Sequence, residues 1–170
     1  MYIQGRFRED RLAHLHAFIR AHALATVVVT TPEPEAFLMP LELVASESNG
    51  VLRGHAARTN HFSTVPSGSR VLVIFQSANA YISPRWYVTV NDNGRVAPSW
   101  NYATVHATGS LHFIDDAAWV RRHLESLTSA HESSRAIPWS LREAPPDFID
   151  GLVKRLVGIE IPIDRIEGKQ

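Results

Sequence analysis

The sequence predicts an α+β fold in which about six antiparallel strands form a small closed barrel with helices at its rim. Short apolar and β-branched runs, separated by turn signals, fill the first two thirds of the chain. Helical patterns occupy about residues 115–158. Because no repeat, low-complexity segment or linker interrupts the 170 residues, a single domain over residues 1–170 is expected.

A helix and two strands are predicted first. Asp10 is a candidate cap for a helix over residues 11–22, and Leu12, Leu15 and Ile19 share one face of it. The β-branched run LATVVVTT at Leu24–Thr31 predicts a buried strand. The returning strand is expected over Glu35–Ala45, where Pro40 indicates a bulge or an edge.

The middle of the chain carries further strand and turn signals. Asn49-Gly50 is a strong hairpin signal, and the run VLRGHA follows it. Arg70–Gln76 is another apolar strand, and Asn91–Gly94 (NDNG) predicts a turn. The segment Asn101–Ile114 is long enough for one bent strand.

The C-terminal third is predicted to be mainly helical. Asp115 and Asp116 can cap a helix that reaches about His131, and Pro145-Pro146-Asp147 begins another. The apolar stripe of that second helix consists of Phe148, Ile149, Leu152, Val153 and Leu156, with Gly158 after its end. Alternating Ile residues at 159–163 then predict an edge strand.

Composition excludes several classes of function. Seventeen basic and seventeen acidic residues give formal neutrality, which is a weak footprint for nucleic-acid binding. The absence of Cys excludes disulfides, thiolate nucleophiles and Cys-based metal sites. The nine His are scattered without HExxH spacing, so no metal site is expected. The charged start MYIQGRFRED and the lack of a long apolar run predict a cytoplasmic protein without a membrane segment.

Two aromatic motifs are the most informative part of the chain. Ala80–Tyr87 reads AYISPRWY and Pro98–Gly109 reads PSWNYATVHATG. Together they hold two of the four Trp and three of the four Tyr, beside Asn, Ser and His. This mixture suits a flat, π-rich ligand with polar edges, although an aromatic corner that only packs two sheets would look similar.

These motifs resemble the PaiB-like family of FMN-binding negative transcriptional regulators, which belongs to the split-barrel flavoproteins with pyridoxamine phosphate oxidase. The resemblance extends over MYIQGRFRED, LHAFIRAHALATVVVT, LRGHAARTN, VLVIFQSANAYISPRWY and GIEIPIDRIEGK. It implies a six-stranded antiparallel Greek-key split β-barrel with flanking helices. It also implies a homodimer that holds FMN at the subunit interface.

The segment Leu52–Asn60 is the candidate phosphate site. Gly54 and two Ala residues allow a phosphate to approach the backbone, and Arg58 offers a fork of donors. The candidate residues are Arg53, His55, Arg58, Thr59 and Asn60. In split-barrel flavoproteins the matching strand and turn bind the FMN phosphate. A polar turn with a solvated Arg is the alternative.

The candidate ring site combines three parts of the sequence. Gln76 ends an apolar strand, where it either meets water or binds the edge of a flavin ring. One wall consists of Tyr81, Ser83, Trp86 and Tyr87, which contact either the ring or a dimer seam. The other wall consists of Trp100, Asn101, Tyr102 and His106. Asn101 is the most suggestive, since a buried amide needs partners, whereas a lone strand His such as His106 is more often structural.

The sequence also departs from the family. Phe37 and Leu38 replace an Asn-His pair, and Val88, Thr89 and Val90 replace Pro-Ser-Lys. The family continues beyond its EGK motif, whereas this sequence stops at Gln170. These departures leave open weak FMN binding, another flat aromatic ligand or no ligand.

Several functions therefore stay open. The first is a PaiB-type FMN-binding protein that acts as a negative transcriptional regulator indirectly or through a partner. We expect no direct tight DNA binding, since the chain is neutral and has no evident helix-turn-helix. The second is a small flavin- or haem-dependent oxidoreductase on the same barrel, and the third is a paralogue that has lost the cofactor.

Overall fold

The computed structural model describes residues 1–30, 33–46, 48–88 and 95–170. Its α-helices are α1 (Leu12–Ala21), α3 (Ala117–Glu132) and α4 (Pro146–Lys154). Its short 3-10 helices are η1 (Gly5–Phe7), η2 (His61–Thr64), η3 (Pro84–Trp86) and η4 (Leu141–Glu143). Its strands are β1 (Arg8–Glu9), β2 (Leu24–Val29), β3 (Glu35–Pro40), β4 (Glu42–Val44), β5 (Val51–Ala57), β6 (Arg70–Gln76), β7 (Ala80–Ile82), β8 (Ser99–Asn101), β9 (Thr104–Ser110), β10 (His112–Ile114) and β11 (Leu156–Lys169).

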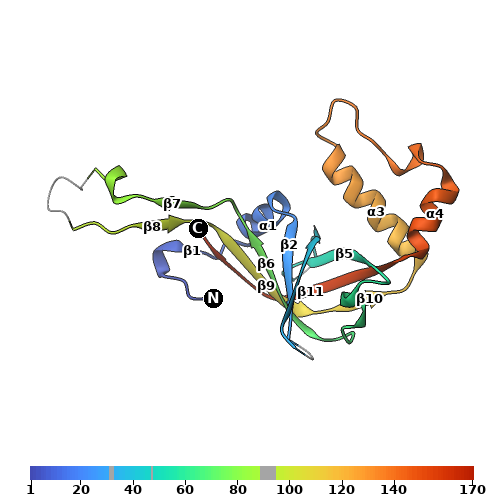
Figure 1. Cartoon of the computed structure of the whole chain (residues 1–170), viewed down its shortest axis with the longest axis horizontal. Helices are drawn as coiled ribbons and strands as arrows, with labels where there is room; N and C mark the ends of the chain where they lie inside the picture. The colour runs from blue at the N-terminus through green and yellow to red at the C-terminus, as the bar shows by residue number, and fades with distance from the viewer. Residues whose placement is uncertain (31–32, 47, 89–94) are drawn as a thin grey trace.

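The strands form a curled antiparallel sheet in the order β3-β2-β6-β9-β11-β5-β4, with β1 and β10 paired to β11 (Figure 1). Strands β7 and β8 make a separate two-stranded ribbon. The fold class expected from the sequence, an antiparallel split barrel with flanking helices, is confirmed. Within the described residues the main sheet has nine strands rather than six, because short strands extend it at both ends of β11.

Strand β11 is central and not an edge strand as the sequence suggested. Its first half pairs with β5, from Leu156 opposite Ala57 to Pro162 opposite Val51. Its second half pairs with β9, from Ile163 to Lys169. Pro162 lies where β11 changes partner, so its missing N–H interrupts neither ladder at its centre. The strand begins at Leu156, so the predicted helix ends earlier than expected, at Lys154.

The start of α1 also differs from the prediction, because its N-cap residue is Arg11 rather than Asp10 and no side chain caps it. Glu9 accepts the backbone N–H of Arg11 at 2.9 Å and its Nε at 2.8 Å. The hydrogen bonds from Arg11, together with His14, lower the pKa of Glu9 to about 2. Glu9 is buried because β1 pairs with β11 and places Glu9 opposite Gly168. At α3, by contrast, the predicted cap is confirmed, since Asp116 accepts the N–H groups of Ala118 and Trp119.

The turn signals are only partly confirmed. The predicted return strand Glu35–Ala45 is divided after Pro40 into β3 and β4, which lie at opposite ends of the strand order. Gly50 precedes β5 with φ of +100°, and a Cβ there would lie 2.9 Å from Leu43, so glycine is required. The predicted single strand over Asn101–Ile114 is divided among β8, β9 and β10. The predicted turn Asn91–Gly94 lies outside the described residues.

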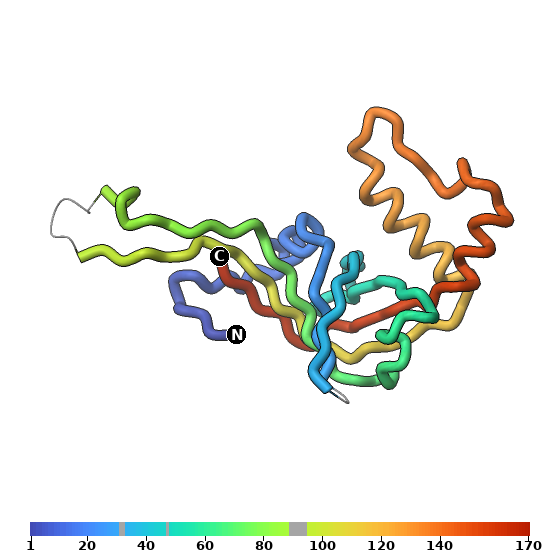
Figure 2. The backbone as a smooth tube through the Cα atoms, in the orientation of Figure 1, coloured from blue at the N-terminus to red at the C-terminus, as the bar shows by residue number. Residues whose placement is uncertain are grey.

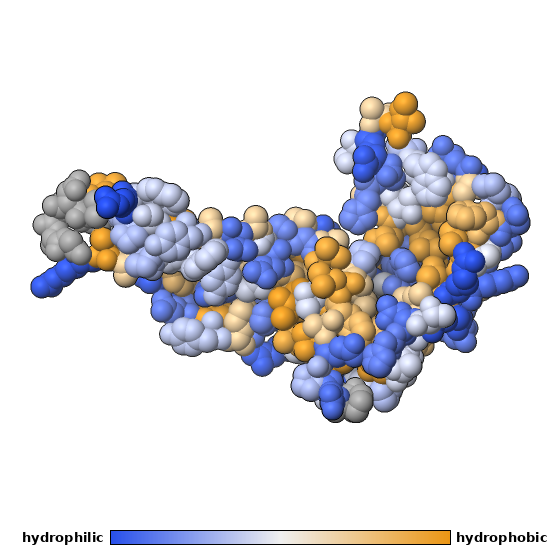
Figure 3. Space-filling view, in the orientation of Figure 1, coloured by the Kyte–Doolittle hydropathy of each residue, from blue (hydrophilic) through white to orange (hydrophobic). Residues whose placement is uncertain are grey.

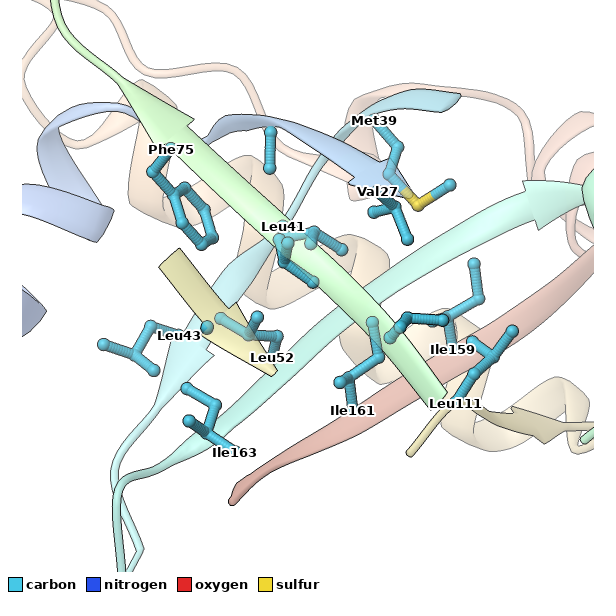
Figure 4. Packing of buried hydrophobic residues seen from close by; sticks show 14 of the residues in the cluster. Val27, Met39, Leu41, Leu43, Leu52, Phe75, Leu111, Ile159, Ile161 and Ile163 are labelled. Atoms are coloured by element: carbon cyan, nitrogen blue, oxygen red, sulfur yellow. The ribbon is translucent and has the colours of Figure 1, made fainter. Parts of the chain in front are cut away.

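The molecule has two apolar cores. The main core fills the barrel with side chains that alternate inward along its strands, among them Val27, Leu52, Phe75 and Ile161 (Figure 4). A second, smaller core lies between α3, η4 and α4 and consists of Val120, Leu141, Ile149 and Val153. The helical hairpin therefore has its own packing and projects from one end of the sheet, as the backbone trace in Figure 2 shows, while α3 contacts β5 and β11.

Candidate functional site

The main groove lies where the β7–β8 ribbon leaves the barrel. The ribbon pairs Tyr81 with Trp100 and extends far from the sheet (Figure 1). The groove has a volume of about 870 Å³ and is open to solvent. It is lined by Phe7, Ser77, Ala78, Asn79, Ala80, Ser99, Trp100, Asn101, Tyr102, Ala103, Lys169 and Gln170.

Two hydrogen bonds, one between backbone groups and one to a side-chain hydroxyl, fix the floor of this groove. Ser77 N donates to Ala103 O at 3.0 Å, and Ala103 N donates to Ser77 Oγ at 3.0 Å. These two bonds tie the segment after β6 to the segment before β9. They continue the β6–β9 ladder, which ends with Gln76 opposite Thr104. The predicted ring wall therefore projects from a rigid base.

Three residues of the predicted ring wall meet in the groove. Trp100, Asn101 and Tyr102 all line it, and Trp100 packs edge to face on Tyr81 with ring centroids 6.2 Å apart. Trp100 is 59% exposed, so its indole is available to a ligand. Gln76 is exposed at the end of β6, immediately before Ser77, and does not itself line the groove.

Lys169 was missed by the sequence analysis. It lies at the end of β11, where its Nζ donates a hydrogen bond to Tyr102 Oη and lies 4.3 Å from the centroid of the Tyr102 ring. Its neighbour Gln170 donates its N–H to Phe7 O at 3.0 Å, which brings η1 to the same place. The EGK motif that ends at Lys169 was visible, but sequence alone did not show that β11 returns to the aromatic wall.

The predicted phosphate residues lie elsewhere. Arg58 follows β5, and its guanidinium donates to Lys154 O at 3.1 Å and to Asp115. This hydrogen bond lowers the pKa of Asp115. Asn60 accepts the N–H of Phe62 at 2.9 Å and so caps η2, while Thr59 is exposed. None of the three lines the groove, which lies at the other end of the molecule near β7 and β8 (Figure 1).

The remaining candidates, Arg53 and His55, lie on β5 beneath α3. Arg53 donates its Nε to Glu160 Oε1 at 2.8 Å. The His55 ring packs edge to face on the His123 ring, with centroids 5.4 Å apart. His55 Nδ1 and both ring nitrogens of His123 are buried without a hydrogen-bond partner among the described residues. Glu42 Oε2 lies 3.5 Å from His123 Nδ1, within ion-pair distance but without hydrogen-bond geometry.

Burial controls the protonation of this histidine cluster. Removal from water lowers the pKa of His55. The same effect, strengthened by the neighbouring His55, lowers the pKa of His123 to about 4. Burial also lowers the pKa of His106, which lies in β9 opposite Ile74 and Glu167 and outside the groove lining. All three rings are therefore neutral at pH 7.

The part of the chain that the structure describes has neither a metal-binding group nor a membrane-spanning helix. No group of three or more His, Asp or Glu side chains there is arranged to hold a metal ion. No helix in that part of the chain combines the length and the apolar character that crossing a membrane requires.

Solved structures share this fold. The FAD and Heme binding protein from Mycobacterium smegmatis superposes with a TM-score of 0.68 at 16% identity, over 95% of this chain and 72% of that one. The flavocytochrome Anf3 from Azotobacter vinelandii gives a TM-score of 0.70 at 11% identity, over 99% of this chain and 72% of that one. At these identities the likeness concerns the fold alone.

Sequence relatives cover nearly the whole chain. "Protease synthase and sporulation protein PAI 2" from Bacillus subtilis is 28% identical over 98% of this chain and 79% of its own length. The uncharacterized protein AN0679 from Emericella nidulans is 28% identical over 99% of this chain and 82% of its own length. The family model described as "Putative FMN-binding domain" matches residues 1–165. In agreement with the PaiB-like resemblance of its motifs, the chain therefore belongs to this family of FMN-binding split-barrel domains.

Proposed function

We propose that this chain binds FMN, with the isoalloxazine ring in the groove beside Trp100 and Tyr102. The observation that carries the proposal is the meeting of three aromatic side chains, the Asn79 and Asn101 amides and one cation in a single groove. Its volume of about 870 Å³ lies within the range of about 300–1,000 Å³ that is usual for small-molecule sites.

Each side chain of the groove has a separate task in this proposal. The rings of Trp100 and Tyr102 offer faces and edges for a flat heterocycle. Asn79 and Asn101 carry both donors and acceptors, which match the polar edge of such a ring. When bound, FMN supplies hydride and one-electron transfer chemistry.

We further propose that two copies of the chain associate around this site. Trp100 on the ribbon is 59% exposed and Trp86 in η3 is 68% exposed, which is more aromatic surface than a monomer normally leaves in water. Apolar side chains also gather over the middle of the sheet (Figure 3). In such a dimer the Arg53–Asn60 segment could reach a ligand only from the second copy, because within one chain it lies away from the groove. A phosphate role for Arg58, Thr59 and Asn60 stays a prediction.

The biological role that we propose is negative regulation of transcription through a partner or a metabolite, rather than through direct DNA binding. Similarity to the "Protease synthase and sporulation protein PAI 2" of Bacillus subtilis supports a regulatory role. Charge argues against direct binding, since the chain is formally neutral and Arg121 already pairs with Asp150. A gel shift with the upstream region should show no complex at nanomolar protein and physiological salt. A sequence-specific complex that is weakened by reversing the charges of Arg121 and Arg122 would contradict this role.

Flavin binding itself is tested by absorption and fluorescence. The purified protein, incubated with FMN and desalted, should retain the yellow flavin spectrum, and titration should quench FMN fluorescence. Trp100→Ala should weaken FMN binding about ten- to hundredfold, because stacking on a base-sized ring contributes about 1–3 kcal/mol. Trp139→Ala is the matched control, since Trp139 is also exposed to solvent, at 44%, but lies beside η4 and outside the groove lining. Undetectable FMN binding by the wild type would contradict the proposal.

A further inference from the structure

Lys169 is unlike every other residue that lines the groove. Among the lining residues in the described part of the chain, it carries the only charged side chain. Its Nζ has a neutral partner, the Tyr102 hydroxyl, and it makes no ion pair with a carboxylate within the described residues. An ammonium held by a phenol keeps most of its attraction for an anion.

Arg58, the cation that the sequence predicted to bind the phosphate, is already paired with a carboxylate. The Arg58 guanidinium is already bound to Asp115 and to Lys154 O. An anion would have to displace that carboxylate before it could use the Arg58 fork. Lys169 would lose only its hydrogen bond to the Tyr102 hydroxyl, and it already lies beside the aromatic wall.

We infer that Lys169 binds the anionic end of the groove ligand and makes the groove selective for phosphorylated flat molecules over their neutral forms. This inference rests on the proposed flavin site, but it names a specificity residue that the site proposal does not require. In the free protein the ammonium lies at the hydroxyl end of Tyr102, with Nζ 4.3 Å from the ring centroid. Transfer of the ammonium from the Tyr102 hydroxyl to a phosphate exchanges a neutral acceptor for a charged one.

The test compares two flavins that differ only in charge. FMN carries a phosphate and riboflavin does not, so their affinities are measured by fluorescence quenching for the wild type and for variants. Lys169→Met should weaken FMN binding about ten- to hundredfold and change riboflavin binding by less than about threefold. Lys169→Arg should keep most of the preference for FMN. Lys154→Met is the matched control, because Lys154 is the other lysine of the chain and lies in α4, far from the groove lining.

Two other outcomes of these titrations would overturn the role of Lys169 as a phosphate-binding residue. Equal losses for FMN and riboflavin in Lys169→Met would mean that Lys169 supports the wall and would overturn the inference. A selective loss of FMN binding in Arg58→Ala but not in Lys169→Met would overturn it in favour of Arg58.

A second measurement needs no flavin. Inorganic pyrophosphate should slow acetylation of the Lys169 amine, followed by mass spectrometry, more than it slows acetylation of Lys154. If the wild type binds neither flavin, the proposed function fails, and protection of Lys169 still decides whether the groove binds an anion. Equal protection of both lysines would overturn the inference.

Discussion

At the scale of single residues, His123 is unusual because its imidazole is buried without a hydrogen-bond partner among the described residues. Its side chain is 1% exposed, it stacks on Trp119 with ring centroids 5.4 Å apart, and its ring nitrogens have no hydrogen-bond partner among the described residues. His55 and Arg53 lie on the β5 side of the ring, and Glu42 on β4 is the nearest carboxylate. A proton on this ring would be buried beside one cation and a second imidazole.

This environment predicts a loss of stability in acid. The unfolded histidine takes up its proton near pH 6.5, whereas the folded His123 stays neutral until about pH 4. Between these values the unfolded state binds more protons, so the free energy of unfolding falls as the pH falls, by on the order of 3 kcal/mol in all. Urea unfolding measured from pH 7 to pH 4 should show this decline, with His55 adding to it.

His123→Phe should flatten the decline, because phenylalanine fills the site without titrating. His131→Phe is the matched control, since His131 is exposed on the same helix. The attribution to His123 would be wrong if both variants kept the wild-type pH profile.

The start of α1 illustrates what sequence could and could not predict at this scale. Two carboxylates, Glu9 and Asp10, precede the helix, and local propensity favours Asp as a cap. The pairing of β1 with the far end of β11 instead turns Glu9 inward, where it accepts the Arg11 N–H, and the helix has no side-chain cap. That contact joins residues about 160 positions apart in the sequence, so no local pattern contains it.

At the scale of elements, the joint between α3 and the sheet depends on a close approach. Gly158 of β11 lies directly under the Trp119 ring, and a Cβ there would come within 2.4 Å of the indole. Gly158→Ala should therefore destabilise the protein by about 1–3 kcal/mol, because the indole must shift off the strand. Thermal or urea unfolding would measure this loss.

Gly151→Ala is the control for that substitution. Gly151 lies inside α4, and a Cβ there meets no atom within 4 Å. Alanine at this position should be neutral or stabilise the protein by up to about 1 kcal/mol, through helix propensity. An equal effect of the two substitutions would show that the contact with Trp119 does not control the joint.

At this scale, the main error was the prediction that β11 is an edge strand. Alternating Ile residues and a proline predicted an edge strand, since both features are typical of edges. In an antiparallel sheet with one face in water, however, a central strand alternates in the same way. Its two halves pair with different neighbours, and the change of partner accommodates Pro162. The apolar strands β2 and β6, in contrast, could be predicted because their β-branched runs have no competing interpretation.

At the scale of the whole molecule, we expect a two-fold homodimer that buries more than about 2,000 Å² in total. The apolar surface comes from exposed Tyr81 and Trp100 on the ribbon, Trp86 in η3, and Leu24 and Leu38 on β2 and β3. Sedimentation should give the dimer mass at micromolar concentration. Trp86→Asp should shift the equilibrium toward monomer, whereas Trp139→Asp should not. A wild type that sediments as a monomer would contradict the expectation.

Only part of the candidate site could be predicted from the sequence. The family and its barrel could be identified from motifs spread over the chain, and Trp100, Asn101 and Tyr102 share a groove as neighbouring residues should. The distance between that groove and the Arg58 turn could not be predicted, because it depends on the order of the strands in the sheet. Lys169 was missed for the same reason, since only the pairing of β11 with β9 brings it beside Tyr102.

The position of β11 also bears on how the protein is made. Strands β1, β5, β9 and β10 all pair with β11, and all of them leave the ribosome before it does. Until β11 emerges, these strands expose unpaired backbone and apolar faces that could associate with other nascent chains. The barrel thus closes late, through contacts distant in sequence, which form slowly. The protein should therefore depend on chaperones during synthesis more than its modest length suggests, and a ribosome stalled before β11 should present a chain that proteases readily digest.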